Sequence, residues 1–171
     1  RKGQVEELSR LVTANPLDGT TGIGHTRWAT HGETTDLNSH PHVGGNGEVV
    51  IVHNGVIENY AKLKEQLQTI GYVFRTTTDS EVIAHMVCHK WLEQIKLGGD
   101  PDSSETCLKA VEASLNEFKG TYGIGVLFRE FTNLLIAARV GSPMVIGVGK
   151  DEYFLASDAS SAITGQEILA D

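Results

Sequence analysis

The sequence predicts an α+β fold, in which helices and strands are largely grouped along the chain. Most segments with apolar residues at helical spacing lie before residue 119. Short apolar runs separated by turn residues then follow between residues 122 and 156. This grouping is typical of α+β layers and not of a regular βαβ alternation. The 171 residues suffice for one domain with a substantial core.

Four segments have the apolar spacing of amphipathic helices, and we expect a helix at each: residues 5–12, 60–70, 79–95 and 108–118. The second ends at Gly71, the residue type expected just beyond a helix C-terminus. The third begins with Thr78-Asp79-Ser80-Glu81, which has the form of a capping box.

The strand predictions depend on apolar runs bounded by turn residues. A short strand is expected at residues 22–25, and a buried strand at 49–52 that ends in a sharp turn at His53-Asn54-Gly55. The later runs should form an antiparallel series: residues 122–128, 134–139, 144–148 and 153–156. Gly141-Ser142-Pro143 marks one of the turns between them.

Composition and charge exclude several classes of partner. The chain has 14 Lys and Arg against 22 Asp and Glu, a formal net charge of -8, and no basic cluster that would neutralise a run of phosphates. We therefore expect no nucleic-acid partner. The apolar runs are too short to cross a bilayer, and the few cysteines do not resemble a disulfide framework. A cytoplasmic location without membrane association is the resulting expectation.

Unusual polar residues gather in three places, at residues 24–33, 53–55 and 78–81. Arg27 is able to clamp a carboxylate, and Asp79 to hold an ammonium group. The Asn54 side-chain amide and the Gly55 N–H are able to stabilise an oxyanion. Together these groups would suit an amino-acid ligand.

Each of these residues also has a simpler structural explanation. Asp79 would cap its helix, and Asn54-Gly55 would be only a turn. Arg27 would form a surface ion pair, and Trp28 would be an ordinary core aromatic. No single motif decides between the two interpretations.

Histidines offer an alternative site, a metal centre. His40 and His42 would combine in it with one of three others: His25, His31 or His53. No cysteine pair or carboxylate stands at ligand spacing, so we expect no metal and no other cofactor.

The remaining histidines and both cysteines are interpreted as structural. His85 and His89 lie four residues apart on a helix, but the Glu of a zinc-protease helix is missing. Cys88 and Cys107 lie in amphipathic helices with no base beside them, so we expect packing residues and not nucleophiles.

Taken together, the motifs resemble the glucosamine-6-phosphate synthase family, also called glutamine:fructose-6-phosphate amidotransferases. The strings that carry this resemblance lie at residues 25–32, 38–42, 53–59 and 78–85, and it continues through 120–123, 137–139, 141–143 and 156–158. The string Thr26-Arg27-Trp28-Ala29-Thr30-His31-Gly32 is its most specific part. The order and spacing of the strings cover nearly the whole chain.

The resemblance implies an N-terminal-nucleophile (Ntn) hydrolase-like fold, a four-layer αββα sandwich that is incomplete at its N-terminus here. Residues 1–171 would be part of a class II glutamine amidotransferase (glutaminase) domain, without the isomerase domain. The implied activity is hydrolysis of L-glutamine to supply ammonia for glucosamine 6-phosphate synthesis. The implied partners are the isomerase domain of the same parent chain and further copies in a homo-oligomer.

The resemblance also assigns roles to individual residues. Arg27 would bind the α-carboxylate of glutamine, and Asp79 its α-ammonium group. Asn54, through its side chain, and Gly55, through its N–H, would form the oxyanion hole.

Three further residues have implied roles around the ligand. Thr30 and His31 would belong to a loop that closes over glutamine, and Trp28 would gate the passage of ammonia. The family's nucleophile is a cysteine at the mature N-terminus, whereas this chain begins with Arg1. We therefore expect the chain alone to be an inactive fragment. The alternative is a non-catalytic glutamine-binding or regulatory module.

Overall fold

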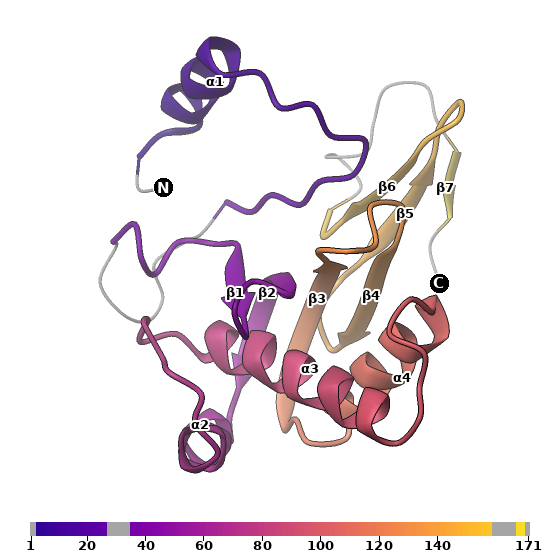
Figure 1. Ribbon diagram of the computed structural model, residues 1–171. Coiled ribbons are helices and arrows are strands. Elements are labelled where there is room, and N and C mark those ends of the chain that lie inside the picture. The colour runs from indigo at the N-terminus through magenta and orange to yellow at the C-terminus, as the bar shows by residue number, and fades with distance from the viewer. Residues whose placement is uncertain (1–2, 27–34, 159–166, 170–171) are drawn as a thin grey trace.

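The structure is a computed structural model, and it describes residues 3–26, 35–158 and 167–169 (Figure 1). Its larger sheet, sheet A, has four antiparallel strands in the order β1-β2-β3-β4. Their bounds are β1 (His42–Gly44), β2 (Val49–Ile57), β3 (Gly120–Phe128) and β4 (Leu135–Val140). β2 and β3 pair along their full lengths, from Val49 opposite Phe128 to Ile57 opposite Gly120.

A second sheet, sheet B, has the strand order β6-β5-β7. Its strands are β5 (Val145–Val148), β6 (Tyr153–Ala156) and β7 (Glu167–Leu169). The predicted antiparallel pairing is confirmed within each sheet. The series nevertheless divides after β4, where Gly141 at a φ of 74° precedes Ser142-Pro143 and turns the chain out of sheet A.

Three of the four predicted helices cover one face of sheet A. They are α2 (Tyr60–Thr69), α3 (Asp79–Lys96) and α4 (Ser104–Leu115). α3 lies across β1 and β2, and α4 and α2 pack against α3 (Figure 1). Within the described part of the chain, no helix combines the length and hydropathy that a bilayer crossing requires.

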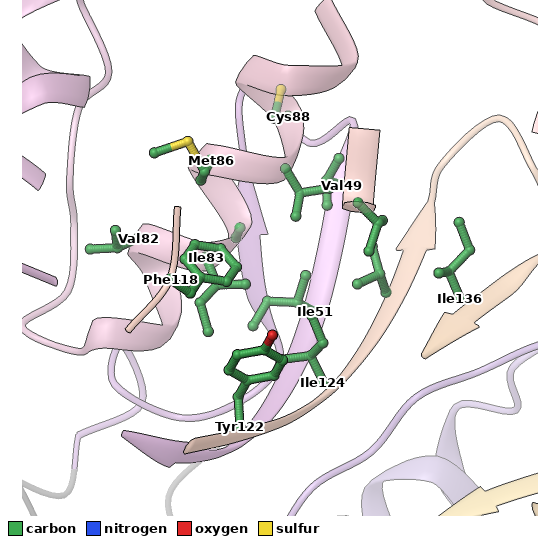
Figure 2. Close-up of a cluster of buried hydrophobic side chains, with 14 of the residues drawn as sticks. Val49, Ile51, Val82, Ile83, Met86, Cys88, Phe118, Tyr122, Ile124 and Ile136 are labelled. Atoms are coloured by element: carbon green, nitrogen blue, oxygen red, sulfur yellow. The ribbon is translucent and has the colours of Figure 1, made fainter. Parts of the chain in front are cut away.

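The core lies between α3 and sheet A (Figure 2). Ile51 of β2, Ile83 of α3 and Ile124 of β3 are fully buried in it. Burying one such side chain contributes about 1.5–3 kcal/mol relative to leaving it exposed. Since the alternate residues of β2 and the helical repeat of α3 meet here, this contact fixes the N-terminus of α3 against β2.

The first predicted helix is confirmed as α1 (Val5–Ala14), but none of its side chains is buried. Its apolar residues Val5, Leu8 and Leu11 remain exposed, and α1 lies apart from the sheets in Figure 1. The strand expected at residues 22–25 is wrong, because this stretch pairs with no strand in the described parts of the chain. Gly22 and Gly24 disfavour a strand, and an isolated extended run has no ladder to stabilise it.

Candidate functional site

Asn54 and Gly55 lie inside strand β2 and not in a turn beyond its end, so the prediction of a turn here is wrong. Asn54 pairs with Gly123, and Gly55 pairs with Tyr122. Gly55 has a φ of 125°, and a Cβ at this position would collide with the carbonyl oxygen of Thr121. The Asn-Gly signal therefore reflects a close backbone approach within the ladder and not a chain reversal.

Asp79 is the first residue of α3, but it does not cap this helix. The cap is Thr78, whose Oγ1 accepts from the Glu81 N–H at 3.4 Å. The Asp79 carboxylate instead reaches across to β2, where its Oδ2 accepts from the Ile57 N–H at 2.9 Å. The Asp79 side chain is still 23% exposed, so its carboxylate also reaches solvent. Its bond to Ile57 holds it beside β2, two residues along that strand from Gly55.

Beneath Asp79, a layer of buried polar side chains joins α3 to β2. Ser80 Oγ lies 3.0 Å from His53 Nδ1 and 3.2 Å from His40 Nε2. His53 Nδ1 also lies 4.0 Å from Asp79 Oδ2. Burial, as the largest effect, lowers the pKa of His53, although the Asp79 carboxylate opposes this. His53 is therefore neutral at neutral pH; it is hydrogen-bonded to Ser80 and lies beside Asp79 without a hydrogen bond to it.

His25 connects this layer to Asn54. Its Nε2 lies 2.6 Å from Asn54 Oδ1, and its ring stacks on His40 with centroids 4.1 Å apart. In the alternative metal site, these histidines would face a common ion. Among the described residues, no group of three or more His, Cys, Asp or Glu is placed to hold a metal. His31, another candidate for that site, lies outside the described residues.

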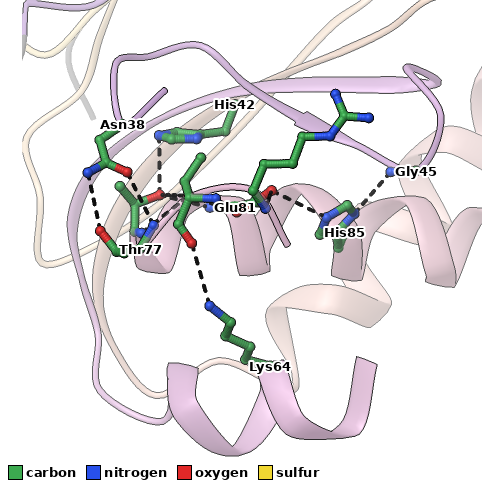
Figure 3. A network of polar contacts seen from close by, with 10 residues as sticks. Asn38, His42, Gly45, Lys64, Thr77, Glu81 and His85 are labelled. Carbon is green, nitrogen blue, oxygen red and sulfur yellow. Dashed lines mark hydrogen bonds and ion pairs between the residues drawn. The ribbon is translucent and has the colours of Figure 1, made fainter. Parts of the chain in front are cut away.

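Glu81 secures the loop that leads into α3 (Figure 3). Its carboxylate accepts from the Arg75 N–H at 2.8 Å and from the Thr76 N–H and hydroxyl, each at 2.7 Å. Burial alone would raise the pKa of Glu81, but these bonds and His85 outweigh it and hold the pKa at about 2. In a capping box this carboxylate would bind the Thr78 N–H, which here donates to Thr76 Oγ1 at 3.3 Å.

A cavity of about 300 Å³ opens beside Asn54. Its wall includes His25 and Thr26, Gly123 and Gly125 of β3, and Leu155 of β6. Both sheets thus contribute to it, and the two glycines leave room because they have no side chain. The cavity is large enough for a small molecule or a short chain segment.

Four predicted ligand-binding residues, Arg27, Trp28, Thr30 and His31, lie outside the described residues. Both cysteines occupy the core as expected. Burial is the largest effect on each thiol and raises the pKa of Cys88 to about 12 and that of Cys107 to about 11. Neither is a thiolate at neutral pH, so neither is an activated nucleophile.

Sequence reasoning treated His25, His40 and His53 only as metal-ligand candidates or parts of a motif, and it did not single out the Ser80 side chain. Their contacts join residues 27 to 40 positions apart. The sequence signal for these contacts is the concentration of histidines just before β1 and within β2, together with the capping-box segment of α3.

Comparison with known proteins shows which family the sequence matches. The glutamine amidotransferase domain family matches residues 13–97, the part of the chain that contains Asn54, Gly55 and Asp79. The chain belongs to the glutamine amidotransferase domain family. This amidotransferase domain is also 47% identical over 162 residues to the glutamine–fructose-6-phosphate aminotransferase (isomerizing) of Bacteroides thetaiotaomicron, covering 95% of this chain and 25% of that protein.

A second relative of this name, from Idiomarina loihiensis, is 48% identical over 158 residues, which are 92% of this chain and 24% of that protein. The amidotransferase domain thus spans about a quarter of the length of the curated relatives it matches. Matching residues cover nearly the whole chain, so the resemblance inferred from the motifs is confirmed.

Two solved structures share the fold. The glutamine phosphoribosylpyrophosphate (PRPP) amidotransferase from B. subtilis, complexed with ADP and GMP, matches with a TM-score of 0.63 and 27% identity, over 85% of this chain and 29% of that one. An allosteric regulatory enzyme of purine biosynthesis matches with a TM-score of 0.65 and 28% identity, over 85% and 30% of the two chains. The Ntn-hydrolase-like class predicted for this amidotransferase domain is confirmed.

Proposed function

We propose that residues 1–171 lie within the glutaminase domain of a glutamine:fructose-6-phosphate amidotransferase, with glutamine as its substrate. The observation that carries the proposal is the hydrogen bond from the Ile57 N–H to Asp79 Oδ2. It brings the predicted ammonium ligand beside the strand that holds the predicted oxyanion donors, Asn54 and Gly55. Family membership and the names of the relatives support the same substrate.

The spacing of these groups fits glutamine. Gly55 and Ile57 are two residues apart on β2, which corresponds to roughly 6.6 Å along a strand. This is comparable to the distance between the amino group and the side-chain amide of an extended glutamine. Asp79 would hold the ammonium group while the amide carbonyl reaches Asn54 and Gly55.

Asp79 would bind the substrate, whereas Asn54 and Gly55 would stabilise the charge of the intermediate. Among the described residues, Asp79 Oδ1 has no hydrogen-bond partner, so it is free to accept from an ammonium group. Asn54 Nδ2 and the Gly55 N–H would donate to the oxygen of the tetrahedral intermediate; loss of one such donor typically lowers kcat by about a hundredfold or more. Arg27 would bind the α-carboxylate, and Thr30, His31 and Trp28 would complete the loop above the ligand.

The nucleophile has to come from outside the described cysteines, because both thiols are buried with raised pKa values. An N-terminal cysteine, with its α-amine as the base, would supply it in an Ntn-type enzyme. The ammonia would pass to an isomerase domain of the same parent chain, and the parent would be a homo-oligomer working in the cytoplasm. The names of the relatives, glutamine–fructose-6-phosphate aminotransferase (isomerizing), support the transfer of ammonia to such a domain.

The test is a calorimetric titration of glutamine into the purified chain, with glutamate release assayed in the same sample. The same pair of measurements is made on the full-length gene product. We expect glutamine to bind, and Asp79→Asn to weaken binding about 10- to 100-fold, because a charge-assisted hydrogen bond contributes about 1.5–3 kcal/mol. Asp102→Asn is the matched control, since Asp102 is exposed in the loop before α4.

The possible results separate the hypotheses. Glutamate release by the full-length gene product, sensitive to Asp79 and insensitive to Asp102, supports the glutaminase. Binding without release in the full-length gene product would identify a glutamine-binding module and refute catalysis. Absence of both binding and release in the full-length gene product would refute the proposal.

A further inference from the structure

His25 is held in one orientation by two independent contacts. Its Nε2 lies 2.6 Å from Asn54 Oδ1, and its ring stacks on His40 at a centroid distance of 4.1 Å and an interplanar angle of 31°. Its other ring nitrogen, Nδ1, is buried and has no hydrogen-bond partner in the described part of the protein. The bond to Asn54 is therefore the one that sets the protonation pattern of the ring.

The chemistry of this bond fixes a tautomer. A carboxamide oxygen accepts hydrogen bonds and does not donate them, so His25 Nε2 is the donor, and in the neutral ring Nδ1 then carries no proton. The bond in turn assigns the two ends of the Asn54 amide, because Oδ1 faces His25 and Nδ2 faces the opposite way. Among the described residues, none accepts a hydrogen bond from Asn54 Nδ2, so this donor is available to a ligand.

The backbone of Asn54 is also fixed, which leaves only its side-chain torsions to be set. Asn54 pairs with Gly123 in the sheet, and its carbonyl oxygen accepts from the Ser142 hydroxyl at 3.3 Å. Without His25, the amide would be able to rotate by half a turn and present Oδ1 where Nδ2 now lies. An oxygen in that place would repel an oxyanion instead of stabilising it.

We propose that His25 is a positioning residue that orients the Asn54 amide so that Nδ2 donates into the cavity beside it. This inference rests on the proposed function, in which Asn54 is an oxyanion donor. His40 supports the His25 ring and bonds Ser80, which bonds His53 beside Asp79. The same polar side chains thus run from the oxyanion end of the site to the ammonium end.

The first arm of the test is NMR of the histidine ring nitrogens in this chain at neutral pH, with the Asn54 side-chain amide assigned. We expect His25 to be the Nε2–H tautomer. We expect the Asn54 amide resonances to shift in His25→Phe and to stay closer to wild type in His25→Gln, whose amide nitrogen also donates. An Nδ1–H tautomer, or Asn54 resonances unchanged in His25→Phe, would overturn the proposal whether or not the protein hydrolyses glutamine.

The second arm measures glutamine hydrolysis by the full-length gene product. We expect His25→Phe to lower kcat about tenfold, less than the loss of a whole oxyanion donor, and to change KM by no more than about twofold. His25→Gln should recover most of the lost rate, which a merely structural role would not predict. Equal rates in wild type and His25→Phe, or equal losses in both variants, would overturn the proposal. If wild type itself does not hydrolyse glutamine, the proposed function fails, and the NMR arm alone decides the role of His25.

Discussion

Replacing Glu81 with glutamine should destabilise the protein in a pH-dependent manner. The carboxylate accepts hydrogen bonds from the Arg75 N–H and from the N–H and hydroxyl of Thr76, and its side chain is only 5% exposed. A glutamine keeps one acceptor oxygen and places an NH₂ group opposite the N–H of Arg75 or Thr76, whose bonds to Glu81 are part-buried. Leaving one such donor unsatisfied costs about 1–3 kcal/mol.

The pKa of Glu81 gives a second measure of the same effect. It falls from 4.5 to about 2, which corresponds to about 3 kcal/mol because a tenfold change in proton affinity is about 1.4 kcal/mol. Because the pKa is depressed in the folded state, this stability is fully present above the ordinary pKa of 4.5 and is lost as the pH falls toward 2. At about pH 3.5, roughly 1 kcal/mol of it should already be lost.

Urea unfolding followed by far-UV circular dichroism tests this reasoning at about pH 7 and about pH 3.5. Glu81→Gln should lower the free energy of unfolding by about 3 kcal/mol at the higher pH and by about 2 kcal/mol at the lower. Glu65→Gln, on the exposed face of α2, is the control and should change it by less than about 0.5 kcal/mol. The reasoning is refuted if Glu81→Gln matches the control, or if its effect is the same at both pH values.

Three other predictions follow from the packing. Gly55→Ala should cost about 2 kcal/mol or more, measured by urea unfolding, because its positive φ and the Thr121 carbonyl leave no room for a methyl group; an unchanged midpoint would contradict this. Cys88 and Cys107 should react with a thiol reagent only after unfolding, since both are buried with raised pKa values; fast labelling of the native protein would show that the core is open. Ile51→Ala should lower the free energy of unfolding by about 2–5 kcal/mol, again by urea unfolding, because Ile51 is fully buried; a loss below about 1 kcal/mol would argue against this core.

Helices were predictable from sequence because their signals are local. The bounds of α2 and α3 follow from apolar residues at helical spacing and from the Thr78 cap. The strand through Asn54 and Gly55 was not predictable from sequence, because the same two residues also favour a turn. Only the pairing with Gly123 and Tyr122, far along the chain, shows which structure they adopt.

The candidate site was predictable only in part for the same reason. Motif resemblance selected Asp79, but its bond to the Ile57 N–H depends on how α3 packs across β2. The contacts that join His25, His40 and Ser80 likewise depend on long-range packing. Sequence patterns identify residue types at these positions, whereas the sheet and α3 determine which of them meet.

The junction between α3 and β2 therefore determines how the site would bind its ligand. Asp79 is already bound to the Ile57 N–H through one oxygen, and Asn54 is already bound to His25. A ligand meeting these groups would not have to order them, which lowers the entropic cost of binding and of charge stabilisation. Glu81 secures the loop just before Asp79, so Glu81→Gln should weaken glutamine binding as well as stability. The weakening should be smaller than that of Asp79→Asn, and calorimetry on the two variants provides the comparison.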